Sequence, residues 1–185
     1  MKETLFETRF LNLAASKRKG KADWIYAHRP NAKNVVIIIP LLHKSDGDYT
    51  LFLITKRPPI TEEYGKKFCV EFPAGLVGDE DKDETTNDAL KKELLEETGY
   101  KAENFKILVN NLVSSGGLTS EKATLALADI YDLEKKAIPI DDGGVIIERI
   151  EIRLDKIADF LKTADEKGYF MCAQTLAGLY FIIND

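Results

Sequence analysis

The sequence predicts an α+β protein: an α/β/α sandwich in which helices flank a mixed β-sheet, preceded by an N-terminal β-hairpin. Three observations support this fold class. Residues 34–42 read NVVIIIPLL, an almost wholly apolar and β-branched run that is typical of a strand buried on both faces. Residues 84–98 carry the strongest helical pattern and end at Gly99, a residue suited to the position after a helix. Strand and helix patterns are interleaved along the chain, with hairpins among them.

The first elements are expected to be strands. Residues 4–13 and 22–29 read as two β-segments around a polar turn at 16–21, which predicts the hairpin. That turn contains four basic residues beside Gly20: Lys17, Arg18, Lys19 and Lys21. We interpret this cluster as a solvated turn in preference to an anion-binding site.

The elements after the central strand follow from turn signals. The turn SDGD joins residues 34–42 to a second strand at 50–57. Residues 58–66 contain two prolines and a glycine, so we expect a loop there, and residues 67–73 are again extended. The elements expected after the helix are strands at 105–113, 122–130 and 145–154, a loop at 114–120, and helices near 155–165 and 171–182.

The composition limits the class of protein. With 185 residues and 44% apolar content, the chain can form one sizeable core. A net charge of −5 argues against nucleic acid as a partner, because binding a phosphate backbone needs a positive face. We expect neither a membrane span, which needs about 20 apolar residues, nor a signal peptide. Cys69 and Cys172 form no disulfide framework and no pair spaced for metal binding, which favours a reduced cytoplasmic setting.

The helix at 84–98 places three carboxylates beside its apolar stripe. Leu90 and Leu94 define the buried face, and Glu93, Glu96 and Glu97 lie along its edge. Like charges four residues apart destabilise a helix, and anions near its C-terminus oppose the macrodipole. A hard divalent cation such as Mg²⁺ would compensate for this cost. The alternative is a solvated acidic face in which Lys92 pairs with Glu96.

The wider spacing of this segment resembles a known signature. Gly78 is followed after five residues by Glu84, and after seven more by Lys92-Glu93-Leu94-Leu95-Glu96-Glu97-Thr98-Gly99-Tyr100. This run is similar to the Nudix signature G-x5-E-x7-R-E-U-x-E-E-x-G-U, where U is a bulky apolar residue. The chain is identified on these residues as a member of the Nudix hydrolase superfamily. Lys92 is the one departure, because the family has arginine there.

The resemblance implies roles for the acidic helix. Glu93 and Glu97 would bind Mg²⁺, with Mn²⁺ as a possible substitute, and Glu96 would assist directly or through water. Glu84 would hold residue 92 in place. Lys92 can form that ion pair only as a point charge, because it lacks the planar fork of a guanidinium group.

The segment before the helix resembles the ADP-ribose pyrophosphatase branch. Residues Glu71-Phe72-Pro73-Ala74-Gly75 are similar to its E-[LF]-P-A-G motif, whose glycine opens the signature. Here Glu84 lies three residues too far from Gly75. Either the loop carries three extra residues or Gly78 has taken over the opening position. We favour the insertion, under which the carbonyl of Ala74 would be a metal ligand.

Further features resemble the same branch and imply a substrate. Trp24 and Arg29 stand where those enzymes hold adenine, and Arg57 stands where they contact the diphosphate. We count Glu71 with these substrate-binding residues. Glu121, in a loop similar to S-P-G-x-[TS]-x-E, would be the general base or a further metal contact.

The expected reaction is Mg²⁺-dependent hydrolysis of ADP-ribose to AMP and ribose 5-phosphate. GDP-mannose or another nucleotide sugar is an alternative substrate, and a catalytically weak nucleotide-sugar sensor is an alternative function suggested by Lys92 and the longer loop. By the resemblance, residues 31–185 would be the Nudix hydrolase domain. Residues 1–30 would be a hairpin segment that contacts adenine and joins a homodimer.

Overall fold

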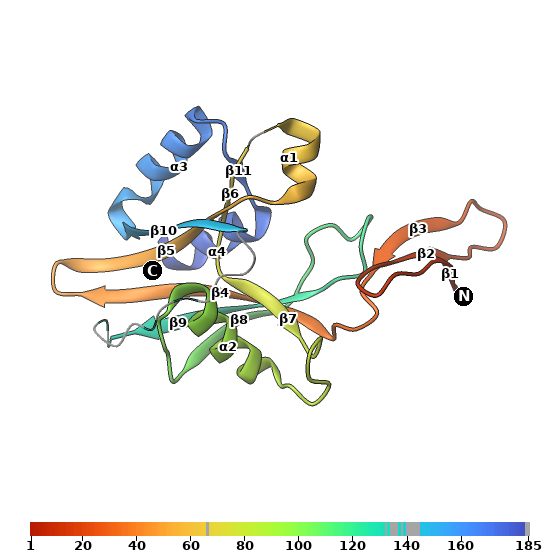
Figure 1. Ribbon diagram of the computed structural model, residues 1–185, viewed down its shortest axis with the longest axis horizontal. Coiled ribbons are helices and arrows are strands. Elements are labelled where there is room, and N and C mark those ends of the chain that lie inside the picture. Colours follow the sequence, from red (N-terminus) through yellow and green to blue (C-terminus); the bar gives the residue numbers. More distant parts are fainter. Residues whose placement is uncertain (66, 132, 134–136, 138, 140–144, 184–185) are drawn as a thin grey trace.

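Figure 1 shows the computed structural model, which describes residues 1–65, 67–131, 133, 137, 139 and 145–183. Its main sheet has the strand order β11 (Phe170–Met171), β6 (Cys69–Glu71), β5 (Gly47–Thr55), β4 (Asn34–Lys44), β9 (Ala123–Ile130) and β8 (Phe105–Leu112). Off this path, β10 (Ile146–Arg153) pairs with β5, and β7 (Ala74–Val77) pairs with β4. The β4–β9 and β11–β6 pairs are parallel and β4–β5 is antiparallel, so the sheet is mixed, as predicted.

Helices cover both faces of this sheet. Helix α2 (Thr86–Thr98) lies on one face, and α3 (Ile157–Glu166) and α4 (Ala173–Ile183) lie on the other (Figure 1). Strand β4 is buried on both faces because its side chains alternate between the two layers. Ile38 belongs to the apolar cluster on the α2 side, and Ile39 belongs to the cluster on the α3 and α4 side. The predicted α/β/α sandwich is confirmed.

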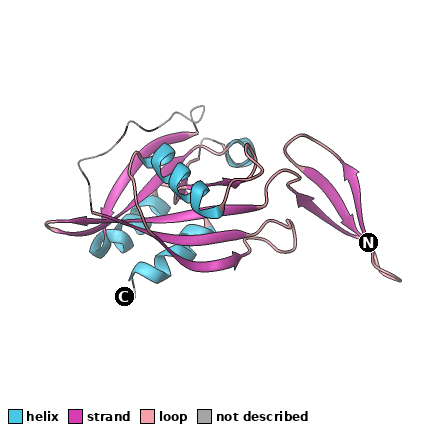
Figure 2. Ribbon diagram, turned by 90° about the horizontal axis from the view of Figure 1, so that it is seen from below, coloured by secondary structure: helices cyan, strands magenta, loops and turns pink. Residues whose placement is uncertain are grey.

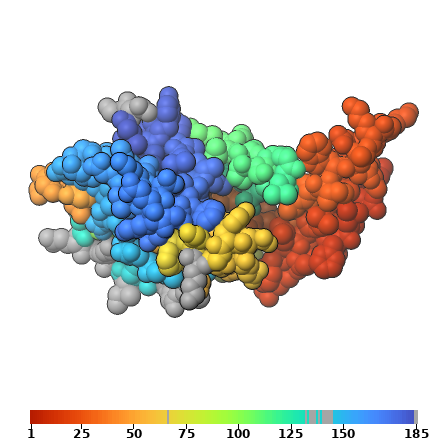
Figure 3. Space-filling view, turned by 90° about the horizontal axis from the view of Figure 1, so that it is seen from above, coloured from red at the N-terminus to blue at the C-terminus, as the bar shows by residue number. Residues whose placement is uncertain are grey.

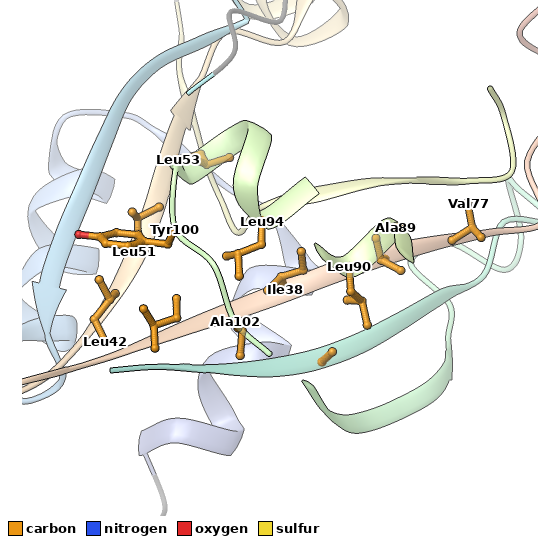
Figure 4. Close-up of a cluster of buried hydrophobic side chains, with 14 residues drawn as sticks. Ile38, Leu42, Leu51, Leu53, Val77, Ala89, Leu90, Leu94, Tyr100 and Ala102 are labelled. Atoms are coloured by element: carbon orange, nitrogen blue, oxygen red, sulfur yellow. The ribbon is translucent and has the colours of Figure 1, made fainter. Parts of the chain in front are cut away.

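Helix α2 is held at its buried stripe and at both ends. Leu90 and Leu94 are buried against the sheet, as Figure 4 shows. At the N-terminus, Thr85 and Asp88 form a capping box, in which the Thr85 hydroxyl accepts from the Asp88 amide at 3.2 Å. Gly99 ends the helix in the left-handed region at φ 79° and donates its N–H to the Leu95 carbonyl, as its position after the helix predicts.

The prediction of a loop at 58–66 was wrong for most of its length. Residues Pro58–Tyr64 form helix α1, which ends at Gly65 with φ 79°; residue 66 lies outside the described residues. Two consecutive prolines suggested a break in regular structure. In the first turn of a helix, however, the amide that proline lacks would have had no intrahelical partner.

The N-terminal segment contains one strand more than predicted. The expected strand 4–13 is divided into β1 (Lys2–Phe6) and β2 (Asn12–Ser16), which pair antiparallel with each other. Thr8 makes the turn between them, because its hydroxyl accepts from the amides of Phe10 and Leu11. The predicted hairpin is formed by β2 and β3 (Trp24–His28). In the intervening turn, the Lys17 ammonium lies 2.7 Å from carboxylates of both Glu3 and Asp23.

This three-stranded sheet is separate from the main sheet and lies at one end of the molecule (Figures 2 and 3). Ala27 on β3 exchanges backbone hydrogen bonds with the loop that follows β8, donating to Leu118 O at 2.7 Å and accepting from Ser120 N at 3.1 Å. Of the helices that the structure describes, none is both long and apolar enough to cross a membrane.

Candidate active site

The strand–turn segment before α2 lies directly against two glutamates of the helix. The amide of Ala74 donates to Glu97 Oε2 at 2.9 Å. Gly75 packs on Glu93 so closely that a Cβ at residue 75 would lie 1.9 Å from Glu93 Cδ. Glycine is therefore required here by the close approach of the side chain. The predicted metal ligand Ala74 therefore lies beside two others, Glu93 and Glu97, which follow it in the chain on α2.

Glu93, Glu96 and Glu97 form the acidic edge of α2, and the electrostatics of this edge suit a divalent cation. Burial raises the pKa of Glu93 to about 7; the neighbouring Lys92 opposes this rise, and the charge of Glu96 adds to it. Few positive charges compensate this buried carboxylate, so a bound cation would stabilise its ionised form. The donors are carboxylate oxygens, with a backbone carbonyl available at Ala74, and this is the oxygen set that Mg²⁺ prefers. The residues present therefore fit a hard divalent metal ion.

Glu84 connects the start of the signature to the helix. One of its oxygens lies 3.1 Å from the Lys92 ammonium, and the other accepts from the Gly78 amide at 2.8 Å. Lys92 also lies 3.6 Å from Glu93. Partial burial opposes the charge on Lys92, but Glu84 and Glu93 outweigh it and raise its pKa. Both glycines that could open the signature thus contact one of its glutamates, Gly75 through Glu93 and Gly78 through Glu84.

Arg149 supports the helix and was missed by sequence reasoning. It lies on β10, and its Nε donates to the backbone carbonyl of Glu97 in the last turn of α2. A cation at this end of a helix is favourable to the macrodipole and offsets part of the cost of the acidic edge. In the sequence Arg149 is one of several charged residues in a strand with alternating polarity, and no local signal connects it to Glu97.

Arg57 and Glu71 form a partly buried ion pair beside the acidic edge. Nε and Nη2 of Arg57 donate to one oxygen of Glu71, Oε2, at 2.9 and 2.6 Å. Burial raises the pKa of Glu71, but Arg57 outweighs that effect and holds the pKa below its usual value. Glu97 adds a further attraction for the Arg57 guanidinium. These contacts orient Arg57 and leave part of its side chain exposed.

A cleft connects these groups. It is lined by Val35, Ile37, Arg57, Glu71, Phe72, Ala74, Cys172, Gln174 and Thr175. Arg57 and Ala74 therefore share one wall, which joins the predicted diphosphate contact to the predicted metal site. Cys172, Gln174 and Thr175 were not predicted, because they reach the cleft only through the packing of the last helix.

The remaining predicted residues lie at the N-terminal sheet. The Trp24 indole donates to the carbonyl of Gly117 at 2.7 Å and carries the Arg18 guanidinium 5.2 Å from its ring centroid. Arg29 forms an ion pair with Glu121 at 2.6 Å. Trp24, Arg29 and Glu121 thus meet at the loop that follows β8.

Glu121 lies on the side of the N-terminal sheet, where it is paired with Arg29. Two clefts contain it, and α2 lines neither. One of them shares Val35, Ile37 and Gln174 with the Arg57 cleft, so a continuous wall runs from Glu121 to Arg57. The predicted site residues therefore form two groups along one surface, the helix edge with Arg57 and the loop with Trp24.

Comparisons with known proteins agree with this geometry. The family model of the NUDIX domain matches residues 32–163. An uncharacterized Nudix hydrolase from Schizosaccharomyces pombe is 36% identical over 148 residues, which cover 75% of this chain and 63% of that protein, less than two thirds of its length. A crystal structure of an ADP compounds hydrolase has the same fold, with a TM-score of 0.67 and 19% identity over 98% of this chain and 89% of that one. The signature geometry and these matches show that the chain belongs to the Nudix family.

Proposed function

We propose that this chain hydrolyses the diphosphate of a nucleoside diphosphate derivative in a Mg²⁺-dependent reaction, with ADP-ribose as substrate and AMP and ribose 5-phosphate as products. The observation that carries this proposal is the contact of Glu93 and Glu97 with Gly75 and Ala74 at the start of β7, where Ala74 also lines the cleft that contains Arg57. The name of the structural neighbour, an ADP compounds hydrolase, supports an adenosine diphosphate group in the substrate.

Different residues of the chain would bind the metal ion, bind the diphosphate and position the metal ligands. Glu93, Glu97, Glu96 and the Ala74 carbonyl would hold Mg²⁺. When bound, the ion supplies charge neutralisation for the diphosphate and lowers the pKa of a water molecule. The Glu71–Arg57 pair presents a guanidinium to the phosphate oxygens and steadies the charge that develops during displacement. Glu84 and Lys92 keep Glu93 in position.

The groups at the N-terminal sheet would bind the base. Trp24 is 47% exposed and offers a stacking surface for adenine, with Arg29 beside it. Glu121 is our candidate for the group that takes the proton or orients the attacking water, and its ion pair with Arg29 must open for that role. If Glu121 instead only positions Arg29, the Glu121→Gln variant raises KM and leaves the pH profile of kcat unchanged.

Release of phosphate from ADP-ribose in the presence of alkaline phosphatase tests the proposal, because the phosphatase attacks the products and not the intact diphosphate. We expect turnover that requires Mg²⁺ or Mn²⁺ and exceeds turnover of GDP-mannose. Faster hydrolysis of GDP-mannose would replace the substrate and keep the reaction. Tight calorimetric binding of ADP-ribose without metal-stimulated turnover would favour the sensor, and the Lys92→Arg variant would then show whether the lost guanidinium is the cause.

The N-terminal sheet also supports a homodimer. Large apolar side chains are exposed on it and on its turn, among them Leu5, Phe6, Phe10, Leu11, Leu13 and Ile25. Apolar residues gathered in this way favour a protein partner. We propose that a second copy covers them and completes the base site. Sedimentation should give twice the chain mass, and Leu13→Lys should give the monomer, whereas Leu176→Lys on the equally exposed surface of α4 should not.

A further inference from the structure

A second set of potential metal ligands lies outside the acidic edge of α2. The Sγ atoms of Cys69 and Cys172 and a carboxylate oxygen of Glu71 all lie within 4.8 Å of one another. The spacing of the two cysteines in the sequence indicated no metal-binding pair. The two residues are distant along the chain, so no short spacing between them could reveal the site.

The sheet brings these ligands onto one face. Cys69 and Glu71 are two residues apart on β6, so their side chains point to the same side. Strand β11 runs parallel to β6 with Phe170 opposite Cys69, and Cys172, two residues further on, therefore lies on that side as well. The Cys172 amide donates to Val70 O at 3.4 Å, while its carbonyl accepts from the amides of Thr175 and Leu176 at the start of α4. The backbone of each ligand is thus fixed by regular structure.

We propose that Cys69, Glu71 and Cys172 form a binding site for a thiophilic divalent cation of the Zn²⁺ class, separate from the Mg²⁺ site. Two thiolates and one carboxylate are a donor set that zinc takes and that Mg²⁺ avoids. With Zn–S bonds of about 2.3 Å, two sulfurs on one tetrahedral ion lie roughly 3.8 Å apart. The present spacing needs only a small inward movement of the side chains.

Glu71 can serve this site without leaving Arg57. Its Oε2 accepts from Arg57 and Thr55, whereas its Oε1 accepts from the Cys172 thiol at 3.0 Å. The cation would take the place of the thiol proton on the Oε1 side. Two thiol protons go to solvent when the ion binds, and no oxidation or reduction takes place.

The charges of this arrangement also balance. Two thiolates and the Glu71 carboxylate carry three negative charges, and a divalent cation leaves one uncompensated. Arg57, which donates to Glu71 at 2.6 Å, supplies the remaining positive charge. Cys69 is 2% exposed, but Cys172 lines the Arg57 cleft, so an ion can reach the ligands and a water molecule can fill the fourth position from the cleft.

Titration of metal-free protein with Co²⁺ tests the site, because tetrahedral cobalt–thiolate complexes absorb in the near ultraviolet and visible. The chain has two cysteines in all, so any thiolate band reports on these residues. We expect a band that saturates at one ion per chain, disappears when Zn²⁺ is added, and persists in excess Mg²⁺. Absence of the band from the folded wild-type protein would overturn the proposal.

Variants separate this site from the acidic helix. Cys69→Ser and Cys172→Ser should each abolish the one-equivalent band, whereas Glu97→Gln should keep it. A full band in Cys172→Ser, or its loss in Glu97→Gln, would contradict the assignment. If the buried Cys69→Ser variant fails to fold, wild-type protein still gives a decision: one equivalent of Zn²⁺ should protect both thiols from a thiol reagent and raise Tm, since the ion links β6 to the start of α4.

Discussion

The acidic edge of α2 and the N-terminal sheet differ in what holds them in place. Leu90 and Leu94, beside the glutamates, are buried in a core shared by the helix and the main sheet. In the N-terminal sheet Ala14 and Ala15 are buried, but larger residues such as Phe6 are exposed. Packing density fixes side chains to fractions of an ångström, and a sheet that covers little apolar surface cannot do this alone. We expect changes at the helix edge to affect chemistry and changes at the N-terminal sheet to affect recognition.

The largest effect is expected at the helix edge. Glu97→Gln keeps the size of the side chain but removes the charge that a metal ion needs. Loss of a residue that merely orients a metal ligand costs about 10–100-fold, so loss of a ligand should lower kcat by more than about 100-fold. KM for ADP-ribose should change far less. Near-normal turnover in steady-state kinetics would remove α2 from the mechanism.

Gly75→Ala should give the second-largest fall in kcat, because the new methyl group would occupy the space of the Glu93 side chain. Displacement of a catalytic group by about 1 Å can cost on the order of 100-fold, and we expect kcat to fall about 10–100-fold in folded protein. Gly117→Ala is the matched control at the N-terminal contact, where the added Cβ would lie 3.6 Å from the Trp24 ring, an ordinary contact. Equal losses of kcat in the two variants would contradict the division between the regions.

Trp24→Ala should affect recognition and leave chemistry intact. Base stacking on an aromatic side chain contributes about 1–3 kcal/mol, so KM for ADP-ribose should rise by about 5-fold to 150-fold. The value of kcat should remain within about twofold. A fall in kcat with unchanged KM would mean that the N-terminal sheet acts on the chemical step.

The two histidines should give the smallest effects, with opposite signs in the two regions. His43, in the main sheet, is partly buried, but hydrogen bonds to Asp129 and Asp48 outweigh that burial and raise its pKa. Its stabilising contribution is present in full below the unfolded pKa of about 6.5 and is lost as pH rises through the higher folded pKa. His28, on β3, has its pKa lowered by burial and by Lys2, so its protonation destabilises the fold as pH falls.

Thermal unfolding at pH 5.5 and pH 8 measures both contributions. His43→Gln should destabilise the protein at pH 5.5 more than at pH 8, by less than about 1 kcal/mol because both aspartates are nearly half exposed. His28→Gln should instead be relatively stabilising at pH 5.5. If the effect of both substitutions on stability changes in the same direction between pH 8 and pH 5.5, the predicted opposite roles of the two histidines are contradicted.

Local patterns were enough to predict much of the framework. The β-branched run at 34–42 predicted β4, and the Leu90–Leu94 stripe with Gly99 predicted α2 and its end. Local patterns gave wrong predictions where one residue type is compatible with two kinds of structure. Proline at 58 and 59 begins a helix here, and Thr8 divides a continuous β-pattern into two strands.

The sequence by itself determined the family, the acidic helix and the residues expected to bind metal, because these depend on spacings within one segment. Only the tertiary structure decided that Gly75 packs on Glu93, that Arg149 reaches the end of α2, and that Cys69 and Cys172 meet at Glu71. Each of these contacts joins elements that are distant along the chain. Strand pairing and core packing choose such partners, and a local pattern of residues contains no information about which distant segment will be the neighbour.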